Sequence, residues 1–120
     1  MAKILCIDDE ESIINLYNDL LSDIMNHELI TEIDSRKAKD LALNEKFDLI
    51  ISDYQMPHLT GSQIVNEIRT TGPNTKTPII FISAYVEDAI KFTNETDNIH
   101  FTSKPILIDD FMKLVEKMIG

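Results

Sequence analysis

The sequence is poor in cysteine, in long apolar runs and in positive charge, and each shortage excludes a class of protein. Cys6 is the only cysteine, so no internal disulfide can form, and its position in the apolar run 4–7 predicts a thiol packed as a small hydrophobe. Apolar runs reach only about five residues, far short of the roughly 20 that span a bilayer, and the amino end shows no signal-peptide pattern. We therefore expect a soluble, cytoplasmic protein with no membrane partner.

Basic residues are outnumbered. Eleven Lys and Arg against 21 Asp and Glu give a formal net charge of -10. Such a charge would repel a phosphate backbone, and the basic residues form no dense cluster. Direct binding of nucleic acid by this chain is therefore not expected.

The overall composition is that of an ordinary globular protein. The chain has 120 residues, of which 43% are apolar and 27% charged, with three glycines and four prolines. This length suits one hydrophobic core and is too short for two. No repeat, low-complexity tract or linker marks a second domain, so we expect one domain over residues 1–120.

Five short segments have the character of strands. Residues 49–51 and 79–82 are continuously apolar and lack the alternation of apolar and polar residues typical of a strand with one solvent-exposed face. Strands of this kind are covered by helices on both sides, as in a parallel sheet. The predicted strands are residues 3–8, 28–33, 47–53, 78–83 and 99–103.

Helical periodicity fills the intervals between these strands. Apolar residues at steps of three and four predict a helix over 11–25 and a final one over 109–119. Ser35 is predicted to cap a second helix, and a third follows Gly61 and stops near Gly72-Pro73. The pattern over 86–94 is weaker. The alternation of predicted strands and helices along the chain predicts an α/β fold with a doubly wound, five-stranded parallel sheet of order 2-1-3-4-5. This is a flavodoxin-like (βα)5 three-layer sandwich.

In such a fold ligands bind beyond the carboxyl ends of the strands, and polar residues gather there in this sequence. Asp8 and Asp9 close the first strand, whereas Asp34 ends the outer second strand and should lie apart. The first and third strands are neighbours in this order, so Asp9 and Asp53 could converge. The residues predicted at these strand ends are Asp8, Asp9, Asp53, Ser83 and Lys104.

Carboxylates that share a crevice repel each other unless a cation compensates them, and magnesium is suited to oxygen ligands and phosphate. The metal and Lys104 would stabilise a transferring phosphoryl group, while a carboxylate acts as nucleophile and the Ser83 hydroxyl donates a hydrogen bond. The expected product is an aspartyl phosphate.

The pattern resembles the receiver domain of two-component response regulators, of the chemotaxis-regulator type, over essentially the whole chain. The matching pieces are residues 4–10, residues 48–53, Met56-Pro57, Gly61, residues 82–84 and Lys104-Pro105.

The resemblance implies a role for each matching residue. Asp53 would be the phosphoacceptor. Asp9 would bind Mg²⁺ or Mn²⁺ directly and Asp8 largely through water, with the backbone carbonyl of Gln55 as a further ligand. Ser83 and Phe101 would form the switch pair. Lys104 would contact the phosphate, and the Lys104-Pro105 peptide would be cis.

The resemblance also implies partners. The phosphoryl donor would be a sensor histidine kinase or a phosphotransfer protein, and the domain would assist its own phosphorylation and dephosphorylation without being a conventional enzyme. The face formed by the fourth helix, fifth strand and fifth helix (the 4-5-5 face) would then bind a downstream effector protein or domain, or a second copy of the chain.

Three other interpretations remain. A metal-dependent phosphatase with an Asp nucleophile usually carries Asp-x-Asp, but Asp53-Tyr54-Gln55 lacks the second Asp. A flavodoxin-like cofactor carrier needs a first loop that cradles phosphate, and residues 8–11 are all acidic. A receiver fold could also bind partners without phosphorylation.

Overall fold

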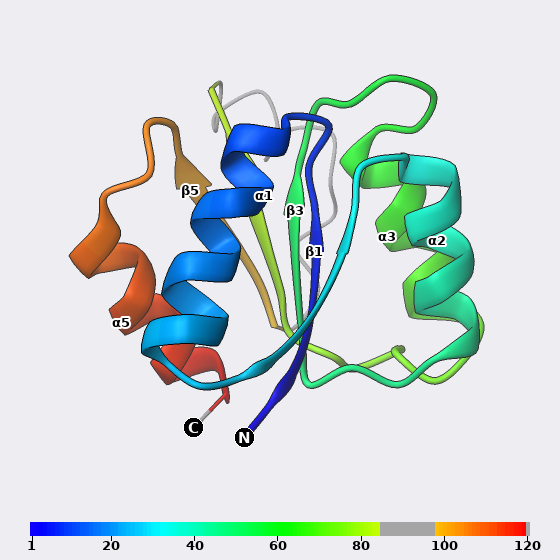
Figure 1. The fold of residues 1–120 in the computed structure, drawn as a ribbon. Helices are drawn as coiled ribbons and strands as arrows, with labels where there is room; N and C mark the ends of the chain where they lie inside the picture. Colours follow the sequence, from blue (N-terminus) through cyan, green and yellow to red (C-terminus); the bar gives the residue numbers. More distant parts are fainter. Residues whose placement is uncertain (85–97, 120) are drawn as a thin grey trace.

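The computed structural model describes residues 1–84 and 98–119, and the helix predicted over 86–94 lies outside them. Five parallel strands form one sheet in the order β2-β1-β3-β4-β5 (Figure 1), which confirms the predicted topology. The strands are β1 (Lys3–Ile7), β2 (Glu28–Glu32), β3 (Leu49–Asp53), β4 (Ile79–Ser83) and β5 (Ile99–Ser103).

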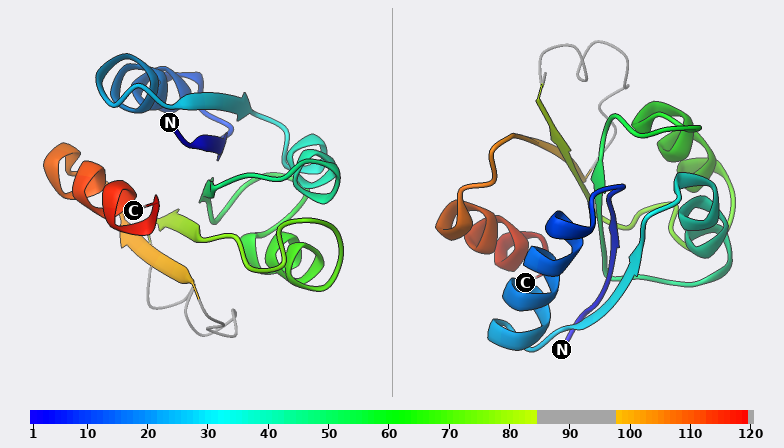
Figure 2. Two further views of the ribbon diagram at one scale, coloured as in Figure 1. Left: turned by 90° about the horizontal axis from the view of Figure 1, so that it is seen from below. Right: turned by 45° about the horizontal axis from the view of Figure 1, so that its top comes forward.

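Helices cover both faces of this sheet (Figure 2). On one face lie α1 (Glu11–Tyr17), its continuation η1 (Asn18–Ile24) and α5 (Ile108–Ile119), and on the other lie α2 (Ser35–Asn44) and α3 (Gly61–Thr70). Alternate residues of β1 supply the two hydrophobic cores: Ile4 and Cys6 face α1 and α5, whereas Leu5 and Ile7 face α2 and α3. The sheet therefore separates two cores, as expected for strands that are apolar on both sides.

Cys6 is fully buried in the first of these cores. Burial raises the pKa of its thiol well above the usual value. The thiol therefore packs as a small hydrophobe, as predicted.

The first helix differs in form from the single α-helix predicted over 11–25. After Tyr17 the hydrogen bonding widens to the π pattern, and Met25 N–H donates to the Leu20 carbonyl five residues back at 3.0 Å. The adjacent residues Leu20 and Leu21 are both buried.

The capping residue of α2 was predicted wrongly. Asp34, not Ser35, is the N-cap, and its carboxylate accepts a hydrogen bond from Arg36 N–H at 2.9 Å. Asp and Ser are equally good N-caps in isolation, so a tertiary contact decides between them. Ser35 is the first helical residue, and its hydroxyl donates instead to the carbonyl of Pro57 at 2.7 Å.

Among the residues that the structure describes, no helix is long and apolar enough to cross a membrane.

Candidate functional site

Three carboxylates meet where β1 and β3 end. Asp8 and Asp9 follow β1, and Asp53 is the last residue of β3. Each offers a carboxylate oxygen, and these oxygens lie within 4.8 Å of one another. Parallel pairing of β1 with β3, in which Ile7 lies opposite Ser52, brings the two strand ends together. The convergence expected of Asp9 and Asp53 is therefore present, while Asp34 caps α2.

Asp8 is completely buried, although it carries an ionisable group. Its Oδ1 accepts a hydrogen bond from Glu10 N–H at 2.9 Å. Its Oδ2 is buried and has no hydrogen-bond partner among the described residues. Burial raises the pKa of Asp8 to about 6, and the charges of Asp53 and Asp9 add to the rise.

Asp53 is only 4% exposed and is held from two sides. Lys104 Nζ lies 3.1 Å from its Oδ2, and Gln55 N–H donates to its Oδ1 at 3.3 Å. Burial raises the pKa of Asp53, and the opposing contacts with Lys104 and Gln55 limit that rise. Burial would lower the pKa of Lys104, but its contact with Asp53 outweighs this, so the net pKa is raised and the ammonium stays charged.

Ser83 ends β4 beside this cluster. It is buried, and its backbone carbonyl accepts a hydrogen bond from Lys104 N–H at 3.0 Å. Asp53 lies opposite Ile82 in the pairing of β3 with β4, so Ser83 is one position beyond the level of Asp53. The peptide bond between Lys104 and Pro105 is cis.

Phe101 lies in the middle of β5 and belongs to an aromatic cluster. Its ring centroid lies 5.6 Å from that of Phe81 and 6.0 Å from that of Tyr54, and the rings of Tyr54 and Phe81 are 5.3 Å apart. Gly61 makes this packing possible, since a Cβ at that position would overlap the Tyr54 ring and come within 2.9 Å of Phe81. Through this cluster Tyr54, the residue after Asp53, packs against Phe101.

Neither the packing of Tyr54 beside Asp53 nor the contact of Ser35 with the loop after Asp53 was predicted from the sequence. Tyr54 directly follows Asp53 and is buried, which its place after an apolar run could have indicated. Ser35 gave no such signal, because its contact with Pro57 joins residues 22 positions apart.

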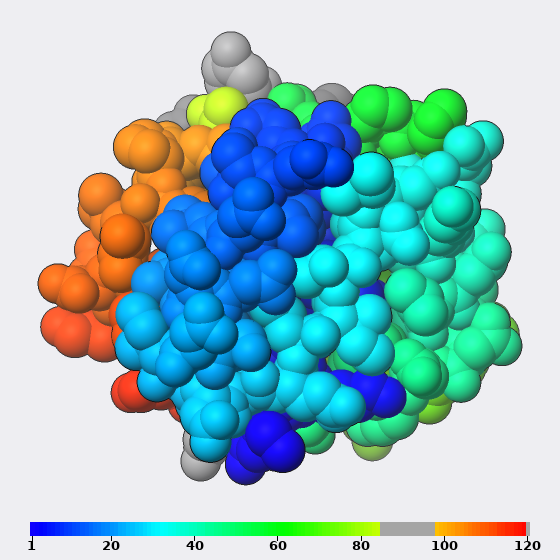
Figure 3. All heavy atoms as spheres, viewed as in Figure 1, coloured from blue at the N-terminus to red at the C-terminus, as the bar shows by residue number. Residues whose placement is uncertain are grey.

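The donor set fits a hard divalent cation. Three carboxylates offer oxygen ligands, and one buried carboxylate oxygen of Asp8 has no hydrogen-bond partner within residues 1–84 and 98–119. Magnesium prefers such ligands and is commonly held by one or two carboxylates together with phosphate oxygens and water. Of the three carboxylates only Asp9 is exposed, and the blue segment that leads into α1 reaches the surface in Figure 3.

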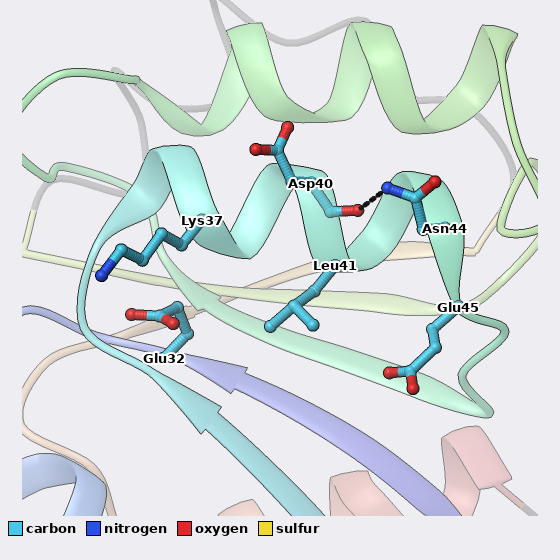
Figure 4. Close-up of a pocket in the computed structure, with 6 residues that line it drawn as sticks. All are labelled: Glu32, Lys37, Asp40, Leu41, Asn44 and Glu45. Atoms are coloured by element: carbon cyan, nitrogen blue, oxygen red, sulfur yellow. Dashed lines mark hydrogen bonds between the residues drawn. The ribbon is translucent and has the colours of Figure 1, made fainter.

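A separate groove of about 460 Å³ opens between β2 and α2 (Figure 4). Its polar lining comprises Glu32, Lys37, Asp40, Asn44 and Glu45, with Leu41 as the apolar residue. None of the three clustered carboxylates lines it, so the groove is not part of the acidic site.

Comparison with known proteins gives one consistent result. The family model described as the response regulator receiver domain matches residues 4–116. Among curated proteins, the response regulator ArlR of Staphylococcus saprophyticus is 33% identical over 84 residues, which cover 70% of this chain and 36% of ArlR. The chain thus spans about a third of that relative's length.

Solved structures agree on the fold. The chemotaxis response regulator CheY4 of Vibrio cholerae superimposes with a TM-score of 0.87 at 28% identity, covering 98% of each chain. The receiver domain of the sensor histidine kinase PA1611 of Pseudomonas aeruginosa, solved with a magnesium ion in its active-site cleft, gives 0.85 at 21% identity, covering 99% of this chain and 98% of that one.

Proposed function

Since the chain belongs to the receiver-domain family of two-component response regulators, we propose that Asp53 is its phosphoacceptor. One observation carries the proposal: the Asp53 carboxylate is buried between the Lys104 ammonium and the Gln55 amide, within 4.8 Å of two further carboxylates. This arrangement holds an anionic nucleophile in place and supplies positive charge where a phosphoryl group would arrive.

Receiver domains generally bind Mg²⁺ in an acidic pocket, and this chain has an acidic cluster of that kind. Asp8, Asp9 and Asp53 would hold Mg²⁺ or Mn²⁺, with the backbone carbonyl of Gln55 as a further ligand. The metal would neutralise the clustered carboxylates and the oxygens of the incoming phosphoryl group.

The transfer is a displacement at phosphorus. An Asp53 carboxylate oxygen forms the new P–O bond, and the P–N bond to the phosphohistidine of the donor breaks. The released imidazole takes up a proton. Lys104 stabilises the charge of the phosphoryl oxygens, and the hydroxyl of Ser83 donates a hydrogen bond to one of them. Attack of water on the phosphorus of the acyl phosphate breaks its P–O bond to Asp53, releases inorganic phosphate and returns Asp53 to its free form. The same residues would assist this second step.

The new dianionic group changes the local charge, and Ser83 and Phe101 would transmit this change to the surface. Phe101 lines a groove of about 350 Å³ between β5 and α5, together with Phe111 and Leu114. This groove supports the 4-5-5 face as the output surface, although the segment predicted as the fourth helix lies outside the described residues.

Receiver domains of response regulators act between histidine kinases and effector domains. For this chain we propose a cytoplasmic location, a sensor histidine kinase or phosphotransfer protein as donor, and an effector protein or domain, or a second copy of the chain, as the partner of the 4-5-5 face.

The experiment that tests this function is phosphorylation by a small donor. Wild type and Asp53→Asn are incubated with acetyl phosphate and Mg²⁺, with and without chelator, and weighed intact by mass spectrometry. We expect a gain of about 80 Da, the mass of one phosphoryl group, only in wild type with metal. A gain that persists in Asp53→Asn would place the acceptor elsewhere. No gain from acetyl phosphate or from sensor-kinase donors would favour a phosphorylation-independent binding module.

A further inference from the structure

The loop between β3 and α3 carries the backbone of Gln55 to the acidic site, so its shape matters for that site. The loop is closed at its base by a hydrogen bond from Gly61 N–H to the Tyr54 carbonyl at 2.9 Å. Near its start Gln55 N–H contacts the Asp53 carboxylate. Between these points Pro57 and His58 are exposed and lie near the tip.

A hydroxyl from another element reaches this tip. Ser35, the first residue of α2, is 1% exposed, and its Oγ lies 2.7 Å from the Pro57 carbonyl oxygen, to which it donates. Capping of α2 does not use this hydroxyl, because the Asp34 carboxylate already accepts the Arg36 N–H. The buried hydroxyl therefore acts between elements.

The same carbonyl belongs to a strained turn. Leu59 N–H donates to the Pro57 carbonyl at 3.0 Å, and His58 between them has a φ of 77°. An i to i+2 hydrogen bond around a residue of positive φ describes the rare form of the γ-turn, which residues other than glycine adopt at a cost. Such conformations persist only where surrounding contacts hold them, and they are common at functional sites.

We propose that Ser35 is a positioning residue for the phosphoacceptor site. By fixing the Pro57 carbonyl, its hydroxyl holds the strained turn and keeps the loop in the form that presents the backbone of Gln55 to Asp53 and to the metal. The effect of Ser35 on phosphorylation rests on the proposed function. The hydrogen bond itself, and its hold on the loop, belong to the unphosphorylated protein. Polar groups that hold metal ligands in their orientation without touching the metal commonly lower metal affinity when they are removed.

The test compares Ser35→Ala with Asp34→Ala. Both variants change the start of α2, but only the first removes the hydrogen bond with the loop, since the Asp34 carboxylate bonds to Arg36 and acts on the loop only through its charge near His58. We expect Ser35→Ala to weaken Mg²⁺ affinity, measured by calorimetric titration, by about 3- to 10-fold, as for the loss of one hydrogen bond. The Mg²⁺ concentration for half-maximal phosphorylation by acetyl phosphate should rise equally, while the rate at saturating Mg²⁺ stays near that of wild type. Asp34→Ala should lower the melting temperature by a few degrees and leave the affinity unchanged.

A third measurement separates this inference from the proposed function. Hydrogen exchange of the Leu59 amide should be faster in Ser35→Ala than in either wild type or Asp34→Ala. If wild type takes up no phosphoryl group, the proposed function fails, and the Leu59 exchange and the Mg²⁺ titration still decide the role of Ser35. Wild-type values of both in Ser35→Ala, or equal changes in Asp34→Ala, would overturn the inference.

Discussion

The environment of Asp8 is unfavourable to the charge of its carboxylate. It is completely buried, one of its oxygens lacks a hydrogen-bond partner among the described residues, and its pKa is raised to about 6. Burial is the first cause, and two neighbouring carboxylates add to it. This penalty is the physical reason to expect a cation at the site.

The pH dependence of stability follows from this shift. Between about pH 4 and pH 6 the unfolded chain has released the Asp8 proton while the folded chain retains it, so the free energy of unfolding falls as pH rises. The shift from 3.8 to about 6 corresponds to roughly 3 kcal/mol. Urea unfolding of wild type and Asp8→Asn in chelator should show wild type losing up to this amount, relative to the variant, across that interval.

Excess Mg²⁺ provides the control, because a bound cation favours the ionised carboxylate and should flatten the wild-type profile. Parallel profiles of wild type and Asp8→Asn in chelator would show that the charge on Asp8 costs nothing.

The types and positions of the residues in the sequence predicted which carboxylates form the site, but not the contacts that hold the neighbouring loop in place. Asp8, Asp9 and Asp53 could be placed together because each stands at the carboxyl end of an apolar strand, and the strand order was predictable. Ser35 could not be placed, because Asp34 and Ser35 are both good N-caps and only the distant Pro57 carbonyl distinguishes their roles.

At the scale of elements, Asn74 joins two connections at the end of the sheet away from the acidic site. Its side chain accepts a hydrogen bond from Phe47 N–H at 2.9 Å and donates to the carbonyls of Ala42 and Glu45. Asn74 is completely buried. One amide therefore binds the α2–β3 connection to the α3–β4 connection.

Asn74→Ala should lower the free energy of unfolding by about 2–4 kcal/mol, because it leaves buried backbone groups without partners. The measurement is urea denaturation, with Asn44→Ala as the matched control, since Asn44 is exposed and bonds only to the Asp40 carbonyl of its own helix among the described contacts. The Asn74→Ala protein that remains folded should still accept a phosphoryl group at saturating Mg²⁺. A loss below about 1 kcal/mol would mean that water or a rearranged loop replaces these bonds.

The same contact explains an error in the predicted strand boundaries. The third strand was predicted from residue 47, because Phe47 is apolar and continues the pattern of 49–51. The strand begins at Leu49 instead, since Phe47 N–H binds Asn74 and not a neighbouring strand. The hydrophobic pattern predicts which segments enter the sheet. Where the hydrogen bonding between strands begins depends on side chains from elsewhere in the chain.

At the scale of the whole molecule, a net charge of -10 opposes compaction, and a cation bound at the acidic cluster should relieve part of this repulsion. A ligand that binds only the folded state stabilises it by about 1.4 kcal/mol at ten times its dissociation constant. For a domain of this size, we expect Mg²⁺ to raise the melting temperature by about 5 °C.

Any salt screens the general repulsion, so the comparison requires NaCl at matched ionic strength. Asp9→Asn removes a carboxylate from the cluster and should abolish the part of the rise that is specific to Mg²⁺. An equal rise with NaCl, or one unchanged in Asp9→Asn, would argue against a metal site among these carboxylates.

The topology as a whole was the most predictable property, because five apolar segments alternate with helical periodicity and parallel strands require crossovers of that length. The π-helical form of η1 was not predictable, since the apolar spacing of 11–25 fits an ordinary α-helix equally well.

The two ends of the chain lie together. Met1 and Ile119 line one pocket at the amino ends of the strands, and the coloured ribbon begins and ends at the bottom in Figure 1, away from the carboxyl ends where Asp53 lies. Neighbouring termini favour circular permutation and insertion of a domain into a host protein. This unit could therefore be spliced into a surface loop of a reporter such as a fluorescent protein, with its acidic site facing away from the junction.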